Sequence, residues 1–91
     1  MSDLAATIFD SHRTGAAFLL TDLDLAMTFL DLANTSRIAG IVRRNRRNAR
    51  TAYDSVLRFL PRLVLTAAER QRIEEKLSEL KGRLEAVGEQ V

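Results

Sequence analysis

Apolar residues recur every three or four positions through most of the chain, which is the spacing of an α-helix that packs on one face. In the first third, the main apolar stripe keeps its phase across Gly15, although glycine costs about 1 kcal/mol in a helix interior. The stripe comprises Ala5, Ile8, Phe9, Ala16, Leu19, Leu20, Leu23, Ala26, Met27 and Leu30. We therefore predict one long helix over residues 3–34, and Gly15 leaves open whether the helix is broken there.

A second apolar line follows the same predicted helix, roughly opposite the main stripe. It consists of Phe18, Leu25, Phe29 and Leu32. A helix that packs on one side needs only one apolar stripe, so two stripes indicate burial on two faces. Two interpretations stay open. Either the helix is central and touches both of its neighbours, or the second line is a protein interface for a second copy of the chain or for another helical protein.

A second helix is predicted over residues 36–60, with Thr35 or Ser36 as its N-cap and Pro61 directly after its end. Its polar side is rich in arginine, and its other side is apolar. The apolar side comprises Ile38, Ile41, Val42, Ala49, Ala52, Tyr53, Val56, Phe59 and Leu60. We expect this apolar side to pack against the first helix.

A third helix is predicted over residues 67–87, because Thr66 and Glu69 have the spacing of a capping box and Gly88 suits the position after a helix end. Its apolar residues alternate in steps of four and three, which is the narrow seam of coiled-coil packing. They are Ile73, Leu77, Leu80, Leu84 and Val87. The seam is about two heptads long, too short for a free-standing coiled coil, so we expect it to pack on the first two helices.

Three amphipathic helices joined by short turns predict an all-α fold, an antiparallel three-helix bundle that forms a single domain over residues 1–91. The first predicted helix is about 48 Å long and the third about 31 Å, if each rises 1.5 Å per residue. Apolar residues near one end of the longer helix would therefore stay uncovered. This excess is a further reason to expect a homodimer.

The spacing of Ala49, Tyr53, Val56 and Pro61 resembles the second helix of a tetratricopeptide repeat. The match covers residues 49–61. A helix hairpin followed by a capped third helix is also similar to the microtubule-interacting-and-transport domains, which are small three-helix relatives of that fold. The resemblance implies helix-hairpin packing and a role in protein–protein interaction.

Charge is distributed unevenly, although the formal net charge is only +2. Residues 1–35 contain five Asp and one Arg, whereas residues 36–62 contain eight Arg and one Asp. This asymmetry predicts that the first two helices lie against each other with complementary charges along their rims.

The arginine cluster in the second helix has two interpretations. A charged run on a helix is usually solvated or paired within the chain, but arginines without neighbouring acids also neutralise phosphates. The candidate anion-binding or nucleic-acid-binding residues are Arg43, Arg44, Arg46, Arg47 and Arg50. Anionic membrane binding is less favoured, because the apolar side of this helix is needed for the core.

Catalytic and metal-binding signatures are not found in the sequence. The chain has no cysteine and a single histidine, His12, and it contains no phosphate-binding loop or nucleophile motif. Asp24 and Asp31 are two turns apart, about 10 Å along a helix, which is too far for a shared-proton pair. We therefore expect no enzyme activity, no metal site and no cofactor.

The apolar stretch from Ala16 to Ala33 is interrupted by three aspartates, so we expect no membrane span, and a cytoplasmic location follows as the default. The sequence therefore predicts a non-enzymatic helical protein–protein interaction or assembly module. The alternative is an arginine-rich nucleic-acid-binding module.

Overall fold

The computed structural model describes the backbone of residues 2–91 and the side chains of residues 15–91. It contains three α-helices and one short 3₁₀ helix. These are α1 (Ser2–Thr35), α2 (Ala39–Phe59), η1 (Leu60–Arg62) and α3 (Ala67–Ala86). The described residues form no strand, and the predicted all-α three-helix bundle is confirmed.

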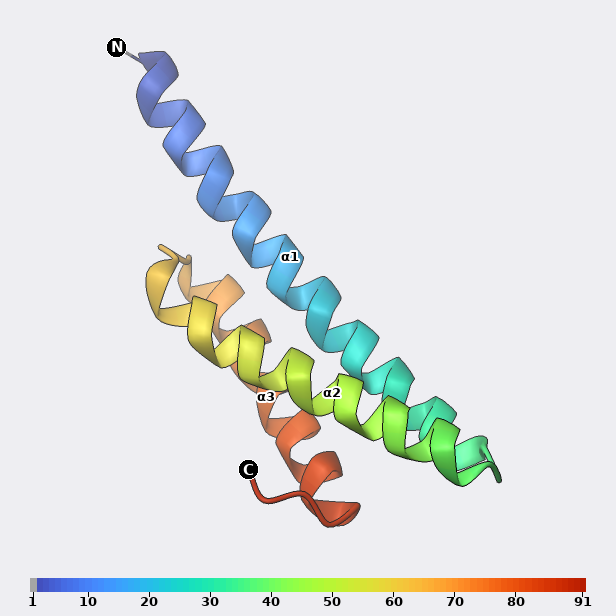
Figure 1. Cartoon of the computed structure of the whole chain (residues 1–91). Helices are drawn as coiled ribbons and strands as arrows, with labels where there is room; N and C mark the ends of the chain where they lie inside the picture. Colours follow the sequence, from blue (N-terminus) through green and yellow to red (C-terminus); the bar gives the residue numbers. More distant parts are fainter. Residues whose placement is uncertain (1) are drawn as a thin grey trace.

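α1 is the central helix, and it contacts both other helices more extensively than they contact each other. α1 and α2 form an antiparallel hairpin, and α3 then runs back beside them in the direction of α1 (Figure 1). The molecule measures 56 × 19 × 17 Å. It is elongated because α1 is about 51 Å long at 1.5 Å per residue, and the N-terminal third of α1 extends beyond α2 and α3 (Figure 1).

α1 continues through Gly15 without a break. A Cβ atom built on Gly15 would lie 2.8 Å from Cδ2 of Leu63, which is much closer than carbon atoms normally approach. Leu63 follows η1 and belongs to the short crossing between α2 and α3. Glycine at this position therefore lets the crossing segment lie against α1.

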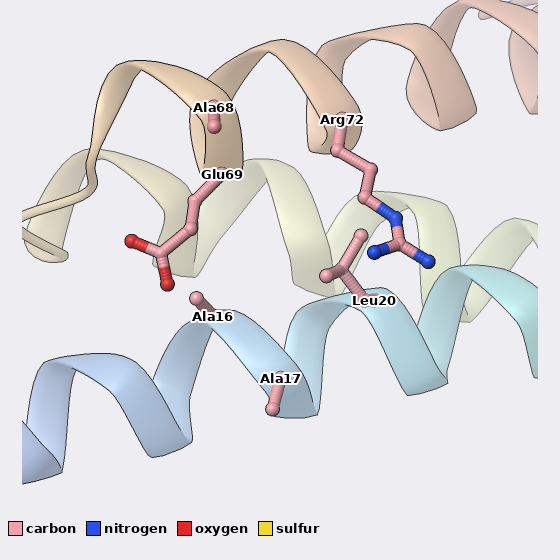
Figure 2. A pocket seen from close by; sticks show the side chains of 6 residues that line it. All are labelled: Ala16, Ala17, Leu20, Ala68, Glu69 and Arg72. Atoms are coloured by element: carbon pink, nitrogen blue, oxygen red, sulfur yellow. The ribbon is translucent and has the colours of Figure 1, made fainter.

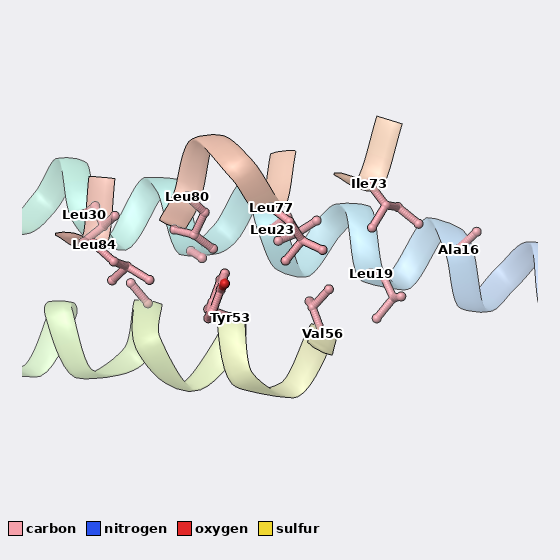
Figure 3. Packing of buried hydrophobic residues seen from close by; sticks show 12 residues of the cluster. Ala16, Leu19, Leu23, Leu30, Tyr53, Val56, Ile73, Leu77, Leu80 and Leu84 are labelled. Carbon is pink, nitrogen blue, oxygen red and sulfur yellow. The ribbon is translucent and has the colours of Figure 1, made fainter. Parts of the chain in front are cut away.

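The core lies between the three helices and is made of small and medium apolar side chains. Figure 3 shows Tyr53 and Val56 of α2 opposite leucines of α1 and α3. The buried cluster comprises Ala16, Leu19, Leu23, Ala26, Leu30, Ala49, Tyr53, Val56, Ile73, Leu77, Leu80 and Leu84. The predicted main stripe is thus confirmed from Ala16 onward, and the seam of α3 is confirmed as well; Ala5, Ile8 and Phe9 lie outside the described side chains.

The predicted core side of α2 is wrong at both ends of the helix. Ile38, Ile41 and Phe59 are exposed, and no residue of α2 before Ala49 is buried. Phe59 lies on the side of α2 opposite Arg50, the residue that contacts Glu89 just after the end of α3. Ile38 and Ile41 lie at the other end of α2, and α3 ends at Ala86 before it reaches them. The first turns of α2 therefore have α1 as a neighbour but lack cover from α3.

The predicted N-cap of α2 is also wrong. Thr35 is the last residue of α1, where its hydroxyl donates a hydrogen bond to the carbonyl of Asp31. α2 begins at Ala39, and its N-cap residue is Ile38, which supplies no side-chain hydrogen bond. Ser36 instead accepts a hydrogen bond from the backbone N–H of Ile38 at 3.2 Å, within the turn.

Both ends of α3 are formed as predicted. The Thr66 hydroxyl accepts from the N–H of Glu69, and the Glu69 carboxylate accepts from the N–H of Thr66. At the other end, Gly88 has φ +92°, and the N–H groups of Gly88 and Glu89 return to the carbonyls of Glu85 and Leu84. This pattern is a Schellman motif, which requires a left-handed residue and therefore favours glycine.

Candidate functional site

Two ion pairs identify the side of α1 that faces α3. Lys76 pairs with Asp24, and Arg83 pairs with Asp31, with the same seven-residue spacing on both helices. The sequence predicted complementary charges along the rims of the first two helices, but no ion pair between described side chains joins α1 to α2, and this includes the two aspartates. Their partners are cations of α3, so these two carboxylates are not available to α2.

The flank of α1 away from these ion pairs carries three exposed apolar side chains. The exposed fractions are 62% for Phe18, 47% for Leu25 and 49% for Leu32. They follow one another at seven-residue steps, so they lie in a line along the helix. Phe29, which the sequence grouped with them, is half-buried and packs against the core cluster.

α2 adds two exposed apolar residues to the same side of the molecule. Arg50 of α2 contacts the segment that follows α3, where it pairs with Glu89 at 3.5 Å and donates a hydrogen bond to the carbonyl of Gln90. Ile41 and Phe59 each lie nine residues from Arg50, about two and a half helical turns. They therefore point away from α3, as Phe18 and its line do on α1.

We call this surface the apolar strip, and it consists of Phe18, Leu25, Leu32, Ile41 and Phe59. The sequence alone did not indicate Ile41 and Phe59, because their helical phase is that of the core. They are identified by the tertiary arrangement, because α3 covers one side of the α1–α2 hairpin and Ile41 and Phe59 lie on the other side.

A second surface covers the first half of α2 and the turn before it. Arg37, Arg43, Arg44 and Arg47 are exposed, and none forms an ion pair with any described side chain. Arg46 is half-buried, and its Nε atom is buried with no hydrogen-bond partner. We call these five residues the arginine tip.

Arg50, which the sequence placed in the same cluster, behaves differently. Its guanidinium pairs with Asp54 at 3.1 Å as well as with Glu89, so its charge is already compensated within the chain. The tip also contains the start of α2, whose first turn has neither an acidic residue nor a side-chain cap. The positive end of the helix therefore adds to the charge of the arginines.

A shallow hollow of about 280 Å³ lies between α1 and the first turns of α3 (Figure 2). Its lining consists of Ala16, Ala17, Leu20, Ala68, Glu69 and Arg72. The carboxylate of Glu69 is held in the capping box, so Arg72 is the remaining charged group. The hollow therefore lacks a pair of groups that could transfer a proton to and from a substrate.

Metal-ligating clusters are likewise absent from the described part of the chain, where no three His, Cys, Asp or Glu residues come together. His12 lies outside the described side chains. None of the described helices is both long and apolar enough to cross a membrane.

No family model, curated protein or solved structure matches the chain.

Proposed function

We propose that this chain is a non-enzymatic assembly module that forms a homodimer through the apolar strip. The observation that carries the proposal is the exposure of Phe18, Leu25 and Leu32. A central position in the bundle would explain a second apolar line on α1, but these three side chains stay exposed although α2 and α3 are both in place. That explanation fits Phe29, which packs against the core.

The strip is suited to a second copy of the chain because it is symmetric about Leu25. If two α1 helices pack antiparallel with Leu25 against Leu25, Phe18 of each copy meets Leu32 of the other. Such an interface is isologous, which is the commonest arrangement in homodimers. The α1–α2 hairpins of the two copies would then form a four-helix arrangement, with α3 on the outside of each hairpin.

Charge favours the antiparallel orientation over the parallel one. In a parallel pair, the two arginine tips would lie side by side and repel each other. In an antiparallel pair, the tips lie at opposite ends of the dimer. Full burial of a Phe or Leu side chain contributes about 1.5–3 kcal/mol, and the strip residues are about half exposed, so each would contribute about 1 kcal/mol towards association.

The resemblance of residues 49–61 to a tetratricopeptide helix supports an interaction role in a general way. Ala49, Tyr53 and Val56 are all buried in the helix hairpin, and Pro61 lies in η1. This resemblance concerns packing within the chain. The partner is proposed from the apolar strip alone.

Light scattering on a sizing column, in low and in high salt, tests the proposal. We expect a dimer whose mass is insensitive to salt, because its interface is apolar. The double change Phe18→Glu and Leu25→Glu should give a folded monomer with an unchanged helical circular-dichroism spectrum.

Leu57→Glu is the matched control, because Leu57 is exposed on α2 but lies outside the strip. This variant should remain a dimer. A wild-type monomer, or a double variant that stays dimeric, would rule out the strip as a self-association surface. An unfolded double variant would show that these residues stabilise the protomer itself.

A further inference from the structure

The arginines of the tip form no ion pair with any described side chain. No acidic residue occurs between Asp31 and Asp54 in the sequence. In the structure, Asp31 pairs with Arg83 and Asp54 pairs with Arg50. The nearest carboxylates along the chain are therefore engaged elsewhere, and the tip keeps its five positive charges.

The arrangement is also unfavourable for α2 itself. Arg43 and Arg47 are four residues apart, and Arg44 and Arg47 are three apart, so like charges are neighbours on the helix surface. They lie in the first half of α2, near the positive end of the helix dipole. An external anion would relieve both effects at once.

Three of these arginines share one side of α2. At 100° per residue, Arg43, Arg44 and Arg47 fall within about 100° of one another. All three are exposed, and they precede Arg50, the residue of α2 that contacts Glu89 just after the end of α3. A guanidinium binds phosphate through two parallel N–H donors, so a group of exposed arginines suits a ligand that presents several phosphates in a row.

The surroundings of the tip define the kind of nucleic acid. Proteins that hold single strands stack bases on exposed aromatic rings. Tyr53 is the nearest aromatic of α2 and is buried, while Phe59 is at the far end of the helix. Asn45 uses its amide N–H to bond the carbonyl of Ile41 within the helix. The tip thus offers phosphate contacts, with no exposed aromatic ring of α2 beside it on which a base could stack.

We propose that the arginine tip binds the phosphate backbone of duplex nucleic acid without sequence preference. Arg43, Arg44 and Arg47 make the main contacts, and Arg37 and Arg46 add to the field. This site adjoins the apolar strip at Ile41, which is three residues from Arg44, but its five arginines belong to a single protomer, so it does not require the proposed dimer.

Fluorescence anisotropy with labelled duplexes of two unrelated sequences tests the site. The test variant carries Arg43→Gln, Arg44→Gln and Arg47→Gln. The matched control carries Arg70→Gln, Arg72→Gln and Lys81→Gln, which removes the same charge from exposed positions of α3. Circular dichroism verifies that both variants are folded.

We expect the wild type to bind both duplexes equally, with an affinity that falls steeply as salt rises. The tip variant should bind at least about tenfold more weakly in low salt, and its log–log salt slope should be smaller by roughly 3, since each phosphate contact contributes about 0.9. The control should keep most of the affinity and nearly the full slope. The monomeric variant Phe18→Glu, Leu25→Glu should show the same dependence on the tip.

Several results would overturn the proposal. One is equal loss of affinity in the tip variant and the α3 control, because binding would then reflect net charge alone. A strong preference for one duplex sequence, or for a single strand of the same length, would contradict backbone recognition of a duplex. Binding to phosphatidylserine vesicles or to polyglutamate under conditions where the duplex does not bind would assign the tip to a membrane or to an acidic protein.

Discussion

Leu63 packs against the backbone of α1 at Gly15, where a Cβ atom would lie 2.8 Å from its Cδ2 atom. Leu63 is half-buried and belongs to the partly buried residues around the core. The glycine and the crossing segment therefore fit each other. This contact connects α1 to residues 63–66, the segment that links η1 to α3.

Gly15→Ala should change stability by different amounts in two backgrounds. In the wild type, the added methyl group must displace Leu63, which offsets the gain in helix propensity. In a Leu63→Ala background the space is open, so Gly15→Ala should stabilise the protein by about 1 kcal/mol. Urea unfolding of the four variants measures the coupling between the two positions. Equal stabilisation in both backgrounds would show that Leu63 moves aside freely.

The core, and not the ion pairs across α1 and α3, should dominate stability. Leu80 is fully buried, and Leu80→Ala should cost about 2–5 kcal/mol because it leaves a cavity. The carboxylates of the two ion pairs are more than half exposed, at 61% for Asp24 and 68% for Asp31. Such surface pairs contribute about 0–1 kcal/mol.

Lys76→Ala and Arg83→Ala test the contribution of the ion pairs directly, because each variant removes the cation of one pair. Each variant should lose less than about 1 kcal/mol in urea unfolding, and the loss should shrink in high salt. A loss as large as that of Leu80→Ala would mean that the pairs hold α3 in place.

The fold could be predicted from sequence because its signals are local and agree with one another. The stripe from Ala16 to Leu30 and the seam from Ile73 to Leu84 have the period of a helix, and both are buried. Thr66 and Glu69 determine the start of α3 by hydrogen bonds between neighbours. Each of these features depends on residues close in the chain, so the sequence alone contains the information.

The candidate surfaces were harder to predict because they depend on what a distant helix covers. Ile41 and Phe59 have the same periodic context as buried residues, yet they are exposed because they lie on the side of α2 opposite Arg50, away from α3. The acidic first segment was expected to lie against the arginine-rich second helix, but the ion-pair partners of Asp24 and Asp31 are Lys76 and Arg83 of α3. Periodicity shows which residues share a side of a helix, but it does not show which neighbour lies there.

Ile38→Asp should raise stability and lower duplex affinity together. Ile38 is the N-cap of α2, is 61% exposed, and gives the helix no side-chain hydrogen bond. An aspartate there would cap the free N–H groups and complement the helix dipole, which should stabilise the protein by about 1 kcal/mol. The same carboxylate would lie in the arginine tip beside Arg37, where it opposes phosphate binding. Ile38→Ala is the control, because it removes the apolar side chain without adding a cap. Urea unfolding and duplex anisotropy should therefore move in opposite directions for the aspartate variant. If both quantities match those of the alanine control, neither the missing cap nor the charge of the tip has the importance proposed for it.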